Sequence, residues 1–186
     1  MDVRRAAEFA AGHARDALNI PLGKSFLGWT ASLLPADHDV VLLAAPAERA
    51  DAMQAWRDLR LVGIDRVIGV LLSTDVAAEL SETLPIVEGQ SMGARASSTA
   101  TVLDVRNDDE WQEGRVPGAR HIPLGELSSR VEELRAAGPL LVHCQGGTRS
   151  AIAVSMLLAR GLRNVSNVAG GYAAWKGAGY TPERDG

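Results

Sequence analysis

Cysteine is almost absent from this sequence, since Cys144 is the single one among 186 residues. A disulfide framework and a multi-cysteine metal site are therefore excluded. The four histidines, His13, His38, His121 and His143, are scattered, without a His-x-His or His-Glu-x-x-His spacing. No metal-ligand set is visible, and we expect a site that uses no metal and no cofactor.

Long apolar runs and a strong net charge are also lacking. No stretch of about 18 apolar residues occurs, which argues against a membrane-spanning helix. The charged start, residues 1–5, leads into no apolar stretch, so no secretory signal is visible and we expect a cytoplasmic protein. The net charge of −4 argues against a general electrostatic attraction to nucleic acid or anionic membranes, so neither is expected as a partner.

The remaining composition is that of an ordered globular protein. Hydrophobic residues make up 46% of the chain and charged residues 23%, so disorder is not expected. A chain of this length forms one domain of ordinary size or two small ones.

An internal repeat decides between these two options. Residues 2–23 return as residues 104–125 at a constant offset of 102, and ten of these 22 positions are identical. We therefore interpret the chain as two copies of one small α/β unit, residues 1–90 and residues 91–186.

In the second copy, short apolar runs alternate with helical patterns. We predict strands at 101–105, 139–143 and 164–168, and helices after Asn107, at 127–134, at 150–160 and after Gly170. Strands that alternate with helices predict a mainly parallel sheet with helices on both faces.

The first copy follows the same order, with strands at 38–45 and 66–71, a helix at 47–61 and a helix cap at Gly63. Residues 73–88 are predicted to be a helix-containing connection, and the small, polar segment 91–99 a linker. The strand before Asp104 has no counterpart before Asp2. Either the first sheet lacks its first strand, or the chain is a piece of something longer.

The loop between the second strand and the next helix carries the chemistry. It consists of Cys144, Gln145, Gly146, Gly147, Thr148, Arg149 and Ser150. Ligands of open parallel sheets bind beyond the carboxyl ends of the strands, and the glycine pair lets backbone N–H groups curve into an anion-binding nest. The helix N-terminus and Arg149 add positive charge, which favours a thiolate. The pattern predicts a nucleophilic cysteine beside an anion site, whereas most lone cysteines are buried and inert.

Other polar and aromatic residues are expected to play supporting roles. Asp104 and Arg106 follow the neighbouring strand, where they line the site or orient the loop by hydrogen bonds. His143 lies within an apolar strand and is predicted to be a core histidine. Tyr172 and Trp175 are predicted to pack in the core.

Six motifs occur in order in the second copy. They are Asp-Val-Arg, Glu-Trp, Gly-Arg-Val-Pro-Gly-Ala, His-Ile-Pro-Leu, Cys-Gln-Gly-Gly-Thr-Arg-Ser and Gly-Gly-Tyr-Ala-Ala-Trp. Residues 101–179 thereby resemble a rhodanese (sulfurtransferase) domain. The resemblance implies a persulfide on Cys144, with the outer sulfur held by the backbone of the loop. Four residues separate Cys144 from Arg149, as in sulfurtransferases, whereas the phosphatase and arsenate-reductase relatives of the fold have five.

The first copy resembles a degenerate rhodanese domain over residues 1–71. It has Ala44-Ala-Pro46-Ala-Glu48-Arg49 where the second copy has the cysteine loop, so it is expected to be catalytically silent. This order of copies, together with residues 26–35, is similar to the tail of proteins that fuse a metallo-β-lactamase-fold persulfide dioxygenase to rhodanese repeats. The metal-binding histidines of such an enzyme are absent from this sequence.

The resemblance implies a sulfurtransferase that takes a sulfane sulfur from thiosulfate or a persulfide and gives it to cyanide or a thiol. An alternative is a sulfur-carrier or docking module that receives persulfide from a protein partner or an upstream domain, with little turnover of small donors. A small phosphatase or arsenate reductase is a third hypothesis, which the short loop disfavours.

Overall fold

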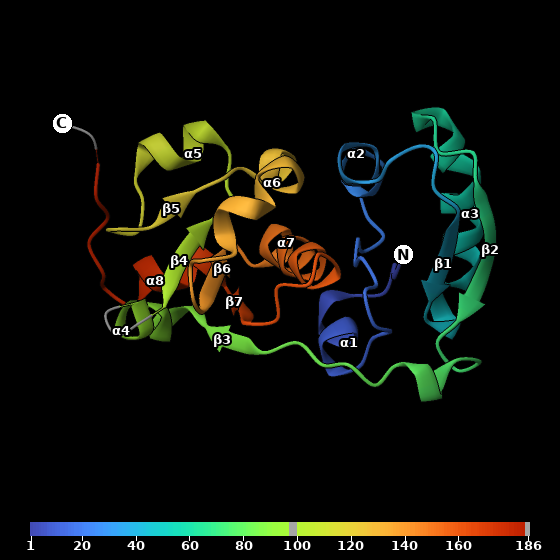
Figure 1. Ribbon diagram of the computed structural model, residues 1–186, viewed down its shortest axis with the longest axis horizontal. Helices are drawn as coiled ribbons and strands as arrows, with labels where there is room; N and C mark the ends of the chain where they lie inside the picture. Colours follow the sequence, from blue (N-terminus) through green and yellow to red (C-terminus); the bar gives the residue numbers. More distant parts are fainter. Residues whose placement is uncertain (97–99, 185–186) are drawn as a thin grey trace. The chain divides into compact units, whose positions relative to one another are not determined.

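The computed structural model describes residues 1–96 and 100–184 and divides the chain into two compact units, Met1–Thr83 and Leu84–Gly186 (Figure 1). Each unit is built around its own parallel sheet. Among the described residues, no helix has both the length and the apolar character needed to cross a membrane.

The second unit contains a five-stranded sheet in the order β3-β7-β6-β4-β5, and every neighbouring pair is parallel. Its strands are β3 (Ile86–Glu88), β4 (Thr101–Asp104), β5 (Arg120–His121), β6 (Leu140–His143) and β7 (Val165–Ala169). Its helices are α4 (Met92–Ala96), α5 (Asp108–Glu113), α6 (Leu124–Arg130), α7 (Thr148–Ala159) and α8 (Gly171–Gly177), with short 3-10 helices at Gly89–Ser91 and Val131–Leu134. The predicted α/β class with a parallel sheet is confirmed.

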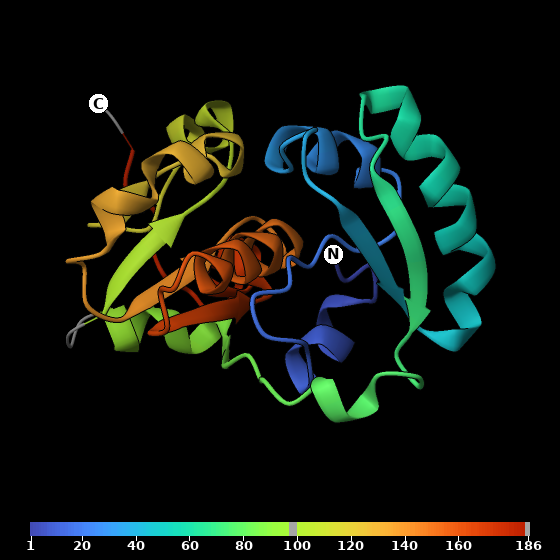
Figure 2. The same ribbon diagram turned by 45° about the vertical axis from the view of Figure 1, so that its right-hand side comes forward.

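Helices cover both faces of this sheet. Helices α6 and α7 lie on one face, and α4 and α8 lie on the other (Figure 2). All four residues of β6 are buried, because this strand lies in the middle of the sheet between β4 and β7. The loop that follows β6 therefore starts from a fully buried strand at the centre of the sheet.

The segment 86–96 differs from the prediction. Residues 86–88 were expected within a connection, but they form β3 and pair with β7. The linker expected at 91–99 is wrong for residues 91–96, which are helical. Met92 is fully buried there, in the core cluster that also contains Val87 and Trp175. Residues 97–99 lie outside the described part of the chain. The division after Thr83 thus falls earlier than the predicted one after residue 90.

The first unit contains a parallel pair of strands, β1 (Val40–Ala44) and β2 (Val67–Leu72), close to their predicted positions. Its helices are α1 (Ala6–Ala11), α2 (Phe26–Leu33) and α3 (Arg49–Leu59), with 3-10 helices at Pro46–Glu48, Arg60–Val62 and Ala77–Glu79. Gly63 caps the 3-10 helix Arg60–Val62 that continues α3, and its φ of 79° is the left-handed conformation that its predicted capping role requires. In place of a regular first strand, Asp2 forms isolated parallel bridges to Leu43 and Asn19.

Candidate active site

Cys144 lies at the carboxyl end of β6, directly before the loop that leads into α7. Both neighbours of β6 are parallel to it, so the ends of three strands meet around this position. The Cys144 side chain is only 2% exposed, which places the thiol beneath the loop and not on the surface. This matches the predicted location beyond a strand end.

The N-terminal end of α7 provides donors to the Cys144 sulfur. The Gly147 N–H donates to Sγ at 3.1 Å, and the Ser150 hydroxyl lies 3.6 Å from it. Gly147 has a φ of 106°, and a Cβ at this residue would lie 3.3 Å from the backbone nitrogen of Gly170. A glycine is therefore needed for the backbone N–H to face the sulfur.

The N-terminus of α8 holds the other side of the loop. The Tyr172 and Ala173 N–H groups donate to the carbonyl oxygens of Cys144 and Gln145 at 2.8 and 3.0 Å. These bonds require a close approach at Gly171, where a Cβ would lie 2.2 Å from the Cys144 oxygen and φ is 53°. The loop carbonyls thus turn toward α8. The sequence prediction included the Gly170-Gly171 motif but missed this role.

Ser150 is completely buried and is fixed by β7. Its hydroxyl donates to Asn167 Oδ1 at 2.7 Å and lies 3.1 Å from the Gly147 carbonyl oxygen. Since the hydroxyl has one proton, the short contact makes Asn167 its favoured acceptor, and the sulfur competes for it. Asn167 was not predicted as a site residue, because nothing in its local sequence distinguishes it from other strand residues.

Arg149 makes a bidentate ion pair with Glu110 of α5. The two terminal guanidinium nitrogens lie 2.5 and 2.7 Å from the two carboxylate oxygens. This pairing holds the pKa of Glu110 below its usual range, and it raises the pKa of Arg149, to which the neighbouring Cys144 also contributes. Glu110 also accepts the Asn107 N–H at 3.2 Å, as one half of a capping box at the start of α5. Its contact with Arg149 was not predicted.

Asp104 and Arg106 form a buried ion pair next to the loop. The Arg106 guanidinium donates to both carboxylate oxygens at 2.6–3.0 Å, donates to the Gly114 carbonyl oxygen at 2.9 Å and stacks on the Tyr172 ring at 4.0 Å. The first unit repeats the arrangement with Asp2, Arg4 and the Gly12 carbonyl. Because it recurs in a unit without a thiol, we interpret it as a structural brace.

His143 is fully buried, in agreement with the predicted core position. Its Nε2 lies 3.5 Å from Asp104 Oδ2, and its Nδ1 lies 3.3 Å from the Cys144 carbonyl oxygen. Burial lowers the pKa of His143 below its usual value, which favours the neutral ring.

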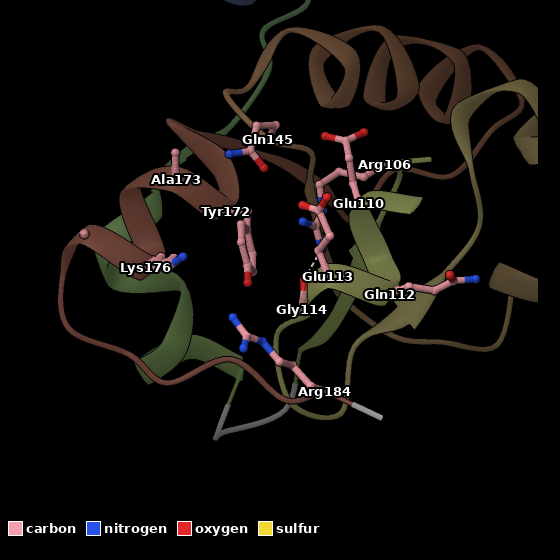
Figure 3. A pocket seen from close by; sticks show the side chains of 11 residues that line it. Arg106, Glu110, Gln112, Glu113, Gly114, Gln145, Tyr172, Ala173, Lys176 and Arg184 are labelled. Atoms are coloured by element: carbon pink, nitrogen blue, oxygen red, sulfur yellow. Dashed lines mark hydrogen bonds between the residues drawn. The ribbon is translucent and has the colours of Figure 1, made fainter. Parts of the chain in front are cut away.

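An open pocket of about 990 Å³ lies beside the cysteine loop (Figure 3). Gln145 lines it from the loop, Arg106 and Glu110 from one wall, and Lys176 from the wall formed by α8. Arg184 of the C-terminal segment lines another side of the pocket. It is held there because the backbone of the adjacent Glu183 makes two hydrogen bonds with the backbone of Arg115. The pocket therefore presents both cations and carboxylates to a ligand. Of the remaining predicted residues, Gly146 and Thr148 are exposed in the loop.

Ala44 is the structural counterpart of Cys144 in the first unit. Asp2 forms a parallel bridge to Leu43, and its repeat counterpart Asp104 pairs in parallel with His143. Ala44 follows Leu43 as Cys144 follows His143, so the two residues hold equivalent positions. The loop after Ala44 is a 3-10 helix that contains Pro46, which has no N–H to donate. This loop therefore offers neither a thiol nor a complete set of backbone donors.

Comparison with known proteins points to one family. A model of the rhodanese-like domain matches residues 90–178. A sulfurtransferase from Allochromatium vinosum is 30% identical over 91 residues, which cover 48% of this chain and 85% of that protein. A rhodanese-related protein from Thermoplasma volcanium, known from a crystal structure, has 29% identity and a TM-score of 0.50, covering 54% of this chain and 99% of that one.

Longer relatives contain further sequence. YrkF of Bacillus subtilis, named as a candidate sulfur carrier protein, is 30% identical over 103 residues, which cover 54% of this chain and 56% of YrkF. The chain thus spans about three-fifths of the length of the longer curated relatives it matches.

Proposed function

The chain belongs to the rhodanese-like family, and we propose that it is a sulfurtransferase that carries a sulfane sulfur on Cys144. The observation that carries the proposal is the setting of the Cys144 sulfur. It accepts the Gly147 N–H at 3.1 Å at the N-terminal end of a twelve-residue helix. Backbone donors and the helix dipole stabilise negative charge at this point, whether it belongs to a thiolate or to the outer sulfur of a persulfide.

The reaction has two displacement steps. The Cys144 thiolate attacks the outer sulfur of the donor, the donor's S–S bond breaks, and its leaving group departs with the bonding electron pair. For thiosulfate the leaving group is sulfite, and for a small persulfide it is a thiolate. Cyanide or an acceptor thiolate then attacks the outer sulfur of the Cys144 persulfide and releases the cysteine thiolate, so no external oxidant or reductant is needed.

The loop residues 145–150 and the helices around them support these steps. The N–H groups of the loop would surround the transferred sulfur. Ser150, whose hydroxyl lies 3.6 Å from Cys144 Sγ, would donate to it only by giving up its hydrogen bond to Asn167. The resemblance of residues 26–35 to fused persulfide dioxygenases supports a small persulfide as the cellular donor. A cytoplasmic thiol would then be the acceptor.

Intact-mass measurement after incubation with thiosulfate or a small persulfide tests this proposal. We expect a gain of one sulfur atom, which cyanide removes with release of thiocyanate. Cys144→Ser should gain none while its circular dichroism stays native, because a hydroxyl has nearly the volume of a thiol but forms no persulfide. Sulfur transfer by a folded Cys144→Ser protein would refute the mechanism.

A sulfur carrier is a second candidate, favoured by the similarity to YrkF. In that case a protein-bound persulfide would load Cys144 much faster than any small donor. Parallel loading rates with a protein persulfide and with thiosulfate separate the two candidates.

We propose further that the first unit is a silent copy of the second. The Ala44 loop lacks both the thiol and, at Pro46, a backbone donor, and Glu48 adds a negative charge. The full chain with Ala44→Cys and Cys144→Ser tests this proposal. We expect it to gain no sulfur, because the thiol would lie in a loop without the donors, and loading of residue 44 would overturn the idea.

A further inference from the structure

The Arg149 guanidinium does not meet a donor as a lone positive charge. Glu110 pairs with both terminal nitrogens, at 2.5 and 2.7 Å, and the two side chains are only 19% and 29% exposed. Glu110 is held in place from its own side by the Asn107 N–H at 3.2 Å. An anion that approaches the loop therefore meets a neutral pair instead of a single positive charge.

From this geometry we infer that Glu110 sets the charge selectivity of the site, and that it disfavours dianionic thiosulfate relative to donors with a less charged leaving group, such as small persulfides. The inference rests on the proposed sulfurtransferase function and specifies its substrate class. Glu110 acts through Arg149 and is a positioning residue, since it does not touch the sulfur.

Other charges around the pocket do not replace the neutralised arginine. The Arg106 charge is matched by Asp104 in a buried pair. Lys176 and Arg184 are exposed at the pocket wall, where solvent screens them, and Glu113 on the same pocket opposes them. Arg149 is thus a partly buried cation that interacts with Cys144, and the state of its partner governs how the site responds to donor charge.

The chain contains two matched controls. Glu8 is the repeat counterpart of Glu110 and accepts the Arg5 N–H at 3.3 Å in the same way, but no ion pair to Glu8 occurs in the described part of the first unit. Glu113 lines the same pocket as Glu110 without pairing with Arg149. Glu8→Gln therefore controls for the loss of a helix-capping charge, and Glu113→Gln for the general field of the pocket.

The experiment compares two donors that differ mainly in charge. Thiosulfate is a dianion, and methanethiosulfonate has a methyl group in place of one of its oxyanions. Rates of sulfur loading onto Cys144 are measured by rapid quenching and intact mass in the wild type and each variant. The readout is the ratio of the thiosulfate rate to the methanethiosulfonate rate. The intrinsic reactivity of each donor is the same for every variant, so a change in this ratio from the wild type reports on the protein.

Glu110→Gln keeps the size and the hydrogen-bonding oxygen of the side chain but removes its charge. We expect the ratio to rise at least tenfold, which corresponds to about 1.4 kcal/mol, to rise less than threefold in Glu113→Gln, and to stay unchanged in Glu8→Gln. Adding Arg149→Gln to Glu110→Gln should abolish the gain. Glu110→Ala should shift the ratio in the same direction, so the inference stays testable where one variant folds poorly.

An unchanged ratio in both Glu110 variants, or an equal rise in Glu113→Gln, would overturn the inference and leave the sulfurtransferase proposal intact. Failure of both donors and of a small persulfide to load the wild-type cysteine would instead refute the proposed function.

Discussion

Replacement of Gly171 by alanine tests whether α8 holds the cysteine loop in its active shape. A Cβ at this position would lie 2.2 Å from the Cys144 carbonyl oxygen, and φ is 53°. The left-handed conformation alone costs a residue with a side chain about 1–2 kcal/mol. Displacing the loop also breaks the Tyr172 N–H bond to the Cys144 oxygen, 2.8 Å in length, at a cost of about 0.5–1.5 kcal/mol, and leaves that oxygen with the 3.3 Å contact to His143 Nδ1. We expect Gly171→Ala to lower the free energy of unfolding by about 1.5–3.5 kcal/mol in total.

Gly118→Ala is the matched control. Gly118 has a similar φ of 71°, but a Cβ there would meet nothing within 4 Å. The free energy of unfolding of this variant should fall only by the cost of the left-handed conformation, about 1–2 kcal/mol. Urea unfolding followed by tryptophan fluorescence gives the free energies, and the rate of sulfur loading from a small persulfide gives the effect on the site.

Loading should fall about 10- to 100-fold in Gly171→Ala, since a shift of the reacting atom by about 1 Å can cost two orders of magnitude. It should be unaffected in Gly118→Ala. Equal stability losses in the two variants, with wild-type loading in Gly171→Ala, would show that α8 does not position the loop.

Three further predictions concern buried polar groups. Asp104→Asn and Asp2→Asn should each lower the free energy of unfolding in urea by about 3–5 kcal/mol, because each leaves a buried arginine without its carboxylate. A loss below about 1 kcal/mol would contradict the role of a structural brace. Asn167→Ala should speed sulfur loading several-fold near neutral pH, because the Ser150 proton loses its favoured acceptor and becomes available to the Cys144 thiolate, and loading at the wild-type rate would assign Asn167 to packing alone. Burial lowers the pKa of His143 below 6.5, so the unfolded chain binds more protons than the folded chain at low pH. The contribution of His143 to stability is therefore complete above pH 6.5, and stability falls below that pH by up to about 1.4 kcal/mol per pH unit. Urea midpoints at about pH 7.5 and 5.5 measure this fall, and His143→Gln should make the two midpoints more alike.

Local patterns in the sequence were sufficient for the main elements of the second unit after residue 100 and for the position of Cys144. The apolar run before Cys144, the glycine pair after it and the largely apolar helix beyond are contiguous in the chain. They therefore predict a strand, a tight loop and a helix N-terminus without knowledge of the rest of the fold. The repeat likewise identified Asp2 and Asp104 as equivalent, and both form the same buried pair with an arginine two residues later.

Contacts between distant segments were decided only by the tertiary structure. Glu110 and Arg149 are 39 residues apart in sequence, and Gly171 reaches the Cys144 carbonyl from a helix that follows another strand. Residues 86–96 looked like connection and linker because a three-residue edge strand and one buried methionine leave too short a pattern to be recognised. Sequence periodicity reports which face of an element is buried, but not which element covers it. The partner that neutralises Arg149 is therefore set by the packing of α5 and the cysteine loop, and by nothing local to either.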